Sequence, residues 1–289
     1  MNSPVRITLV VDNESSSDLI AEHGFSAWIE AGDQRILFDT GQGIALKSNA
    51  FHLGVDLSQA TILVLSHGHY DHTGGIPVFL AANATAPVLS GRGLGTLRFS
   101  CHPDQAPRAI GIGSDVLHAL SDLPMHRRIE LQVPHYLAQS IGISGPIPRL
   151  TSFEDTGGPF FLDEEKQRPD SISDELAMWF ETSAGLVVLT GCCHAGLVNT
   201  VNHIRTVSGI ERVHGIIGGL HLLQASEHRL EKTVRFIADC APDFLIPCHC
   251  TGQHVVDRLL QEFGPELVLP GRAGQIHELG LLKSRPSSG

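Results

Sequence analysis

Basic side chains are scarce in this sequence. The 289 residues include 20 Lys and Arg against 31 Asp and Glu, which gives a formal net charge of −11. A surface that binds a polyanion normally carries a basic patch, and the sequence has no run of Lys or Arg to build one. We therefore expect neither nucleic acid nor an anionic membrane as a partner.

Long apolar runs and a regular cysteine pattern are also missing. No apolar stretch reaches the length of a membrane span, and the first six residues lack the apolar core of a signal peptide. The cysteines follow no disulfide spacing; they are Cys101, Cys192, Cys193, Cys240, Cys248 and Cys250. We expect a cytoplasmic protein with reduced thiols. A structural zinc site built from four of them (192, 193, 248 and 250) is the alternative, although each pair is closer than the usual Cys-x₂₋₄-Cys.

The composition allows a sizeable core, with 42% hydrophobic and 18% charged residues. Apolar strands that alternate with helices predict an α/β fold. We expect a single domain over residues 1–289 with an inserted loop or lid region at about 91–172. The expected strands are 5–11, 25–30, 34–38, 60–65, 87–90, 128–133, 175–181, 185–190, 213–217, 244–247, 267–269 and 275–278, and the expected helices are 42–53, 76–82, 197–207, 226–239 and 253–263.

Three histidines and an aspartate fall within six residues directly after the apolar segment Ala60 to Leu65. They are His67, His69, Asp71 and His72. A loop at the carboxyl end of a buried strand is where α/β proteins usually place their chemistry. Imidazole and carboxylate ligands suit zinc, manganese or iron. In an extended loop the first two histidines can hold one ion, and the last two residues can hold a second ion nearby.

Three more histidines each follow a predicted strand: His194, His221 and His249. Taken singly, a histidine at a strand end is more often an ordinary polar residue than a ligand. Together with a loop that already carries four ligand-type groups, they favour one shared metal site.

The pattern His67-x-His69-x-Asp71-His72 after an apolar strand resembles the metal motif of the metallo-β-lactamase superfamily. The resemblance implies an α/β fold of the αββα type, in which two mixed β-sheets pack together between helices. It also implies two divalent metal ions per chain, zinc first, with manganese or iron as alternatives.

The resemblance also assigns the remaining ligands. It implies that His194 completes the first site with the first two histidines of the motif. His249 then completes the second site with the aspartate and the last histidine. Asp39 is placed beneath the metal loop, where a buried carboxylate can orient ligand N–H groups. A turn-capping Asp39 is the alternative.

His221 departs from the superfamily pattern. Most members have an aspartate at this strand end, and that aspartate bridges the two ions. A neutral imidazole cannot bridge as a carboxylate does. His221 therefore either ligates a weaker or more widely spaced second site, or donates a proton to the substrate.

Several segments are similar to a narrower branch of the superfamily. They are residues 22–26, 66–75, 143–149, 174–177, 191–196, 218–222 and 247–252. This branch contains the archaeal dihydropterin–ribofuranosylaminobenzene phosphate synthases. Within it Asn13, His23, Arg149 and Glu175 are candidates for the substrate pocket, with surface or structural roles as the alternative. His23 can donate a proton, and Arg149 can bind a phosphate or a carboxylate.

The motifs favour a hydrolase that attacks an ester, a lactone or a phosphoester with a metal-activated water. Asp71, His221 and His23 are the candidate catalytic groups, and the substrate is a small molecule. A synthase of the pterin type is the alternative. A mononuclear iron oxygenase of this fold, or a metal-binding protein without turnover, is a further alternative. A homodimer is compatible with the sequence.

Overall fold

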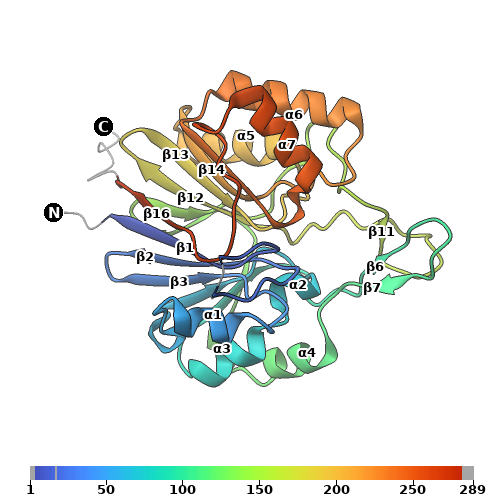
Figure 1. Ribbon diagram of the computed structural model, residues 1–289. Helices are drawn as coiled ribbons and strands as arrows, with labels where there is room; N and C mark the ends of the chain where they lie inside the picture. Colours follow the sequence, from blue (N-terminus) through green and yellow to red (C-terminus); the bar gives the residue numbers. More distant parts are fainter. Residues whose placement is uncertain (1–3, 17, 282–289) are drawn as a thin grey trace.

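Two β-sheets pack face to face in the computed structural model, which describes residues 4–16 and 18–281 (Figure 1). Within these residues the strand order of the first sheet is β16-β1-β2-β3-β4-β5-β8, and that of the second is β15-β14-β13-β12-β10-β9. The first sheet comprises β1 (Val5–Val11), β2 (Ser26–Ala31), β3 (Gln34–Phe38), β4 (Ile62–Val64), β5 (Val88–Gly91), β8 (Arg128–Leu131) and β16 (Ile276–Leu279). The second comprises β9 (His135–Ala138), β10 (Ile141–Ile143), β12 (Ala177–Thr182), β13 (Gly185–Thr190), β14 (Val213–Gly219) and β15 (Phe244–Cys248).

Helices cover the outer face of each sheet (Figure 1). The first sheet is covered by α1 (Leu46–His52), α3 (Ile76–Ala82) and α4 (Ser114–Ser121), and the second by α5 (Leu197–Ser208), α6 (Glu227–Cys240) and α7 (Gln253–Phe263). A short helix, α2 (Tyr70–Thr73), and three single turns, η1 (Leu57–Gln59), η2 (Met125–Arg127) and η3 (His249–Thr251), lie in the loops. This arrangement confirms the expected αββα sandwich.

Strand β13 illustrates why the sheets pack in this way. All six of its residues are buried. Val187 and Leu189 face the core between the two sheets, whereas Leu186 and Val188 face the core beneath the helices. Because successive side chains of a strand point to opposite faces, a strand that is covered on both faces has a continuous apolar sequence. Such runs were therefore recognisable as strands without the structure.

Residues 91–172 contain more regular structure than the expected loop region. Helix α4 lies in a part that was expected to be loop. It was not predicted because Val116 is its one buried residue, so the sequence has only a weak helical pattern of apolar residues. Strand β8 forms one edge of the first sheet, and β9 and β10 lie at an edge of the second. The expected strand at 267–269 is also wrong, since it forms an isolated bridge between Val268 and Leu245. Residues 1–3 and 282–289 of the expected domain lie outside the described residues.

Three short strands form a separate sheet that we call the arm. They are β6 (Phe99–Ser100), β7 (Arg108–Ala109) and β11 (Phe160–Phe161). The arm projects from the end of the sandwich opposite to the chain termini (Figure 1). It brings together two segments, paired through β6 and β11, that are about 60 residues apart in the sequence.

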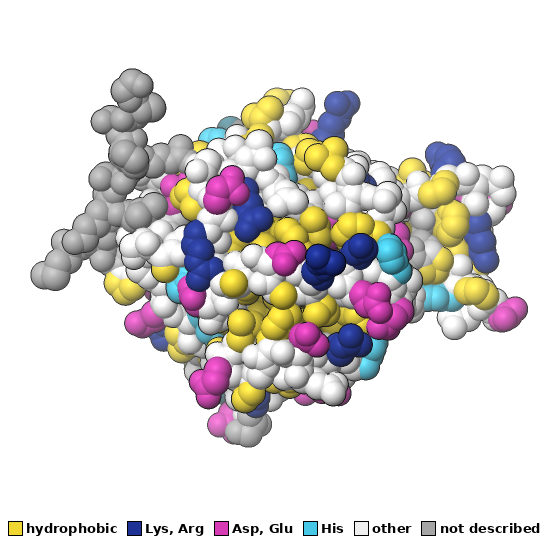
Figure 2. Space-filling view, turned by 90° about the horizontal axis from the view of Figure 1, so that it is seen from above, with side chains coloured by type: hydrophobic (Ala, Val, Ile, Leu, Met, Phe, Trp, Pro, Cys, Tyr) yellow, Lys and Arg dark blue, Asp and Glu magenta, His cyan; other side chains and the backbone are white. Residues whose placement is uncertain are grey.

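The outer surface mixes charges of both signs. On the face above α6 and α7, Lys and Arg side chains are interspersed with Asp and Glu (Figure 2). Among the described residues, no helix is both long and apolar enough to cross a bilayer.

Candidate metal site

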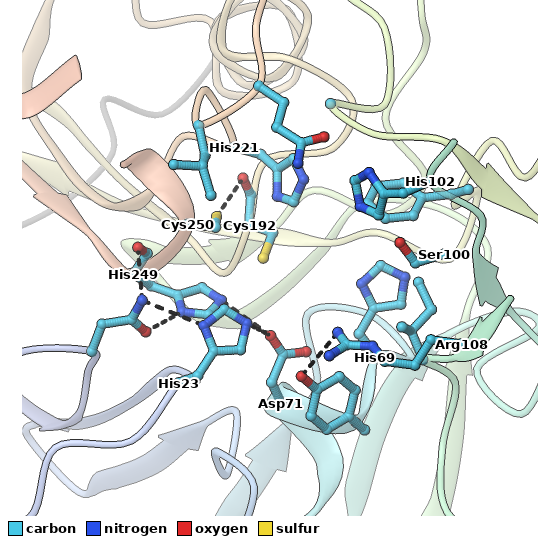
Figure 3. A pocket seen from close by; sticks show the side chains of 17 residues that line it. His23, His69, Asp71, Ser100, His102, Arg108, Cys192, His221, His249 and Cys250 are labelled. Carbon is cyan, nitrogen blue, oxygen red and sulfur yellow. Dashed lines mark hydrogen bonds and ion pairs between the residues drawn. The ribbon is translucent and has the colours of Figure 1, made fainter. Parts of the chain in front are cut away.

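Four strands end at the same rim of the sandwich and bring ligand-type side chains to it. Strand β4 leads into the loop with His67, His69, Asp71 and His72, and β13, β14 and β15 lead to His194, His221 and His249. The last three strands are parallel neighbours, so their carboxyl ends meet at one edge of the second sheet. A cavity of about 240 Å³ opens there, and the labelled side chains point into it from both sheets and from the arm (Figure 3).

His67, His69 and His194 form a first cluster. The Nε2 atom of His67 lies 2.9 Å from Nδ1 of His69. The ring of His194 is centred 4.8 Å from the ring of His67 and 4.9 Å from that of His69. Burial holds the pKa of all three well below the usual 6.5. The imidazoles are therefore neutral, which is the form that binds a metal.

Asp71, His72 and His249 form a second cluster beside the first. The Oδ2 atom of Asp71 lies 3.4 Å from Nε2 of His249 and 3.1 Å from Nε2 of His23. The rings of His72 and His249 are centred 5.1 Å apart. Burial opposes ionisation of Asp71, but these histidines outweigh it and hold its pKa well below the usual range. The carboxylate is thus available as a ligand.

Asp39 lies beneath the metal loop, at the end of β3. Its carboxylate accepts hydrogen bonds from the backbone N–H of Ser66 at 2.7 Å and from the Ser66 hydroxyl at 2.6 Å. It also contacts Nδ1 of His72 at 2.7 Å. Burial lowers the pKa of His72, but Asp39 and Asp71 outweigh it and raise the value to about 9. Asp39 therefore fixes both the loop backbone and the ring orientation of His72.

Several ring nitrogens at the cavity have no partner. Nδ1 of His194 contacts the Thr156 carbonyl at 2.8 Å, and Nδ1 of His249 contacts Oδ1 of Asn13 at 2.8 Å. The Nε2 atoms of His194 and His69 are buried and have no hydrogen-bond partner in the described part of the chain, and that of His249 lies 3.4 Å from the Asp71 carboxylate. An unsatisfied buried polar atom costs free energy. An ion at the first cluster would satisfy Nε2 of His194, an ion at the second would bind Nε2 of His249, and the donor set of imidazoles and a carboxylate fits zinc, manganese or iron.

His221 lies on the wall of the cavity, next to the first cluster. Its ring is centred 4.1 Å from that of His194, and its buried Nδ1 has no hydrogen-bond partner within residues 4–16 and 18–281. Gly157 passes so close that an added Cβ would lie 2.1 Å from Cδ2 of His221, so only glycine fits there. This place is compatible with a ligand and with a proton donor.

Two cysteines line the cavity and were not among the expected site residues. Sγ of Cys192 lies 3.1 Å from Nε2 of His72, and Sγ of Cys250 lies 3.6 Å from the carbonyl oxygen of Cys192. Cys250 directly follows His249, and Cys192 lies two residues before His194, which was the one signal in the sequence. Their side-chain directions could not be read from it.

The other two cysteines of the alternative zinc site point elsewhere. Sγ of Cys193 contacts the Thr200 hydroxyl of α5 at 3.5 Å, and the Cys248 thiol donates to the Ile246 carbonyl at 3.3 Å. The four-cysteine zinc site is therefore wrong, because these thiols do not converge. All six cysteines are free and buried.

Asn13 and His23, two of the expected pocket residues, line the cavity. Nδ2 of Asn13 lies 3.4 Å from Nδ1 of His23, and its Oδ1 contacts His249 as described above. The His23 side chain is half exposed, so it lies between the second cluster and the solvent. The hydrogen bond with Asp71 raises the pKa of His23.

Glu175 and Arg149 do not line the cavity. Both carboxylate oxygens of Glu175 accept backbone N–H groups, those of His194 and Ala195, at 2.5 Å each. Glu175 is therefore buried behind the first cluster, and burial raises its pKa to about 7. Arg149 donates from Nη2 to the Ser171 carbonyl at 2.6 Å, away from the metal cavity. Neither side chain therefore lines this cavity, and their expected role in substrate binding stays a prediction.

The arm closes the side of the cavity opposite to His23 (Figure 3). It contributes Ser100, His102, Arg108 and Phe160. The ring of Phe160 is centred 5.5 Å from those of His69 and His194, and Arg108 donates from Nη2 to the Tyr70 hydroxyl at 3.3 Å. The sequence analysis missed these residues because no local motif marks them; folding of two distant segments brings them to the site.

The chain is similar to several known proteins over most of its length. A family model of the metallo-β-lactamase superfamily matches residues 20–111. An uncharacterised protein of Methanocaldococcus jannaschii is 30% identical over 260 residues, which are 88% of this chain and 94% of that protein. The 7,8-dihydropterin-6-methyl-4-(β-D-ribofuranosyl)-aminobenzene-5'-phosphate synthase of the same organism is 27% identical over 258 residues, 86% of this chain and 87% of the synthase.

Among solved structures, a metal-dependent hydrolase of the β-lactamase superfamily aligns with a TM-score of 0.78 and 27% identity. The alignment covers 96% of this chain and 99% of that protein.

Proposed function

Because this chain belongs to the metallo-β-lactamase superfamily, we propose that it is a metal-dependent hydrolase of small-molecule esters, lactones or phosphoesters. One observation carries the proposal: two clusters of ligand-type side chains from four strand ends lie side by side at one rim, beside a cavity that His69, Asp71 and His249 line. Buried imidazoles without partners destabilise a fold unless an ion satisfies them. Their convergence therefore supports a bound pair of ions.

The ligands divide between two sites in this proposal. The first site is His67, His69 and His194, and the second is Asp71, His72 and His249. When bound, the ions would lower the pKa of a water molecule and offset the negative charge that develops on the substrate.

His23 is the proton donor that the geometry favours. Its Nε2 contacts Asp71, and this hydrogen bond raises its pKa, so the ring stays protonated over a wider pH range. Half of the side chain is exposed, so a leaving group can reach it from the cavity. His221 could supply the same proton from the opposite wall (Figure 3).

The arm favours a substrate with negative charge. Arg108 lies beside the cavity with Ser100 and His102, which gives three potential donors to an anionic group. A guanidinium binds phosphate or carboxylate oxygens in a bidentate manner. In a protein of net charge −11, this local positive group supports a phosphoester over a neutral ester. The arm would then serve as the lid expected from the sequence.

The relationship to the dihydropterin–aminobenzene phosphate synthase supports a second candidate, a synthase of that type. The same ligands and the same arginine would then hold a phosphate or diphosphate leaving group. At 27% identity the relationship does not decide between the two reactions.

Elemental analysis followed by a substrate panel tests the proposal. The protein is loaded with zinc, manganese or iron, and each form is assayed with ester, lactone and phosphoester probes, and with a dihydropterin plus an aminobenzene riboside phosphate. Two ions per chain and turnover of a hydrolytic probe are expected. Turnover of the pterin pair alone would favour the synthase, and one iron with oxygen consumption would contradict both.

A further inference from the structure

The strand end after β14 lacks the group that usually joins two ions in this superfamily. His221 stands where an aspartate most often bridges them, and a neutral imidazole has one free lone pair. Another anionic side chain between the two clusters would take the place of that carboxylate if they hold a close pair of ions.

Cys192 lies close to ligand atoms of both clusters. Its Sγ lies within 4.8 Å of the ligand atoms of His67 and His194 in the first cluster. It lies within the same limit of the ligand atoms of His72 and His249 in the second. In Figure 3 its sulfur points into the space between His249, His221 and His69.

Two buried nitrogens on either side point to a missing ligand at this thiol. Nε2 of His194 has no hydrogen-bond partner in the described ranges, and Nε2 of His249 makes a long contact with the Asp71 carboxylate, at 3.4 Å. His194 is 0% exposed and His249 is 7% exposed, so water from outside cannot readily satisfy them. Each belongs to a group that also contains Cys192.

We propose that the Cys192 thiolate is a ligand shared by both metal ions, in place of the usual bridging carboxylate. This inference rests on the proposed two-ion site. A bound cation deprotonates a coordinating thiol outright, so binding at Cys192 releases one proton. Thiolate is a soft ligand that selects zinc or iron over manganese. The site is therefore expected to prefer zinc or iron.

The neighbouring cysteines provide matched controls. Cys193 is adjacent in the chain, but its side chain packs toward Thr200 and away from the cavity. Cys250 also lines the cavity, and its ligand atom is grouped with those of Cys192 and His221 only. Cys250 can reach at most one side of the site, whereas Cys192 reaches both.

X-ray absorption at the zinc edge tests the inference without an activity assay. Zinc–sulfur bonds are about 2.3 Å long and zinc–nitrogen bonds about 2.0–2.1 Å, so a sulfur neighbour is resolved. The zinc-loaded wild type and the variants Cys192→Ser, Cys192→Asp, Cys193→Ser and Cys250→Ser are compared, with metal content measured for each. We expect one sulfur per zinc in the wild type, Cys193→Ser and Cys250→Ser. Cys192→Ser should lose the sulfur and at least one zinc, and Cys192→Asp should lose the sulfur but keep both zinc ions.

A wild type with two zinc ions and no sulfur neighbour would overturn the inference and leave the proposed function intact. So would a sulfur signal that persists in Cys192→Ser, or half a sulfur per zinc, which indicates a ligand to one ion only. If Cys192→Ser does not fold, the Cys250→Ser variant decides. Loss of its sulfur neighbour at zinc would overturn the inference, and a retained sulfur neighbour would support it. A wild type that takes up none of the three metals would overturn the proposed function together with the inference.

Discussion

Glu175 fixes the turn that carries His194: one oxygen of its carboxylate accepts the backbone N–H of His194, and the other accepts that of Ala195. Asp12 does the same for the other end of the site, since its Oδ2 accepts the backbone N–H of His249 at 3.0 Å. Each of these ligand-bearing turns is thus fixed by a buried carboxylate beneath it. Metal ligands that are held in this way keep their positions without the ion.

Glu175 makes stability depend on pH. Burial raises its pKa from 4.5 to about 7, so between these values the folded state binds more protons than the unfolded state. Its contribution to the free energy of unfolding therefore falls as the pH rises from 4.5 to 7. In urea unfolding of metal-free protein, we expect Glu175→Gln to gain stability relative to the wild type across this window, by up to about 3 kcal/mol. A constant difference at all pH values would contradict this assignment.

Asp39 should control metal affinity without touching the ion. Asp39→Asn removes the charge that orients His72 and one acceptor for Ser66. Loss of such a supporting group typically weakens metal binding about 10- to 100-fold, and we expect a loss in this range. Competition with a chromophoric chelator measures it. Asp56→Asn is the control and should leave the affinity unchanged. Asp56 is exposed, and its side chain accepts the backbone N–H of Ser58 at the start of η1.

His69→Ala should lower metal content and hydrolytic activity together. The ring lies in the first cluster, with its Nε2 unsatisfied and its Nδ1 beside His67. We expect the metal affinity of the first site to fall by more than about 100-fold, because removing a ligand weakens binding more than removing a group that only orients a ligand. His214→Ala is a suitable control, because His214 lies at the other end of β14 and pairs with Asp243. Full metal occupancy in His69→Ala would contradict the ligand assignment.

Arg98 joins the arm to the metal loop through a buried ion pair. Its guanidinium contacts both oxygens of Asp174, at 3.1 Å and 2.5 Å, and Asp170 at 3.0 Å. Asp174 in turn accepts the backbone N–H of Gly68 at 2.9 Å. Arg98→Ala leaves two buried carboxylates unpaired, which should cost about 3–5 kcal/mol of unfolding free energy.

Denaturant unfolding measures this loss. Arg168→Ala breaks an ion pair of similar length with Asp163, but both groups are near the surface, so its effect should be small. Equal losses of unfolding free energy in the two variants would mean that the buried ion pair of Arg98 stabilises the fold no more than the exposed one. A loss confined to Arg98→Ala would show that the buried ion pair between the arm and the metal loop stabilises the fold.

The site was predictable where the signal is local. The metal loop follows a buried strand directly, and the histidines after β13, β14 and β15 follow strands whose residues are almost all buried. The direction of a side chain after a sharp turn is not local information. Cys192 and Cys193 are neighbours in the chain, yet one faces the cavity and the other α5.

The sequence also does not show whether a polar side chain faces the pocket or is buried behind it. Glu175 has the residue type of a pocket group, but its two oxygens are occupied by backbone N–H groups beneath His194. The arm was missed for a different reason: β6 and β11 pair across about 60 residues, and short strands carry little pattern. Arg108 and Phe160 therefore reached the cavity without any sequence signal.

Arg108 should set the preference for charged substrates. It lies at the cavity wall on β7, held by the Tyr70 hydroxyl and stacked at 5.5 Å over the Tyr70 ring. Because the guanidinium would bind the non-reacting oxygens of an anion, Arg108→Ala should raise KM for a phosphoester about 10-fold or more and leave a neutral ester nearly unchanged. Arg92→Ala, outside the residues that line this cavity, is the control. Steady-state kinetics with the two probes decide the point, because a parallel loss for both would mean that Arg108 supports the arm and does not select the substrate.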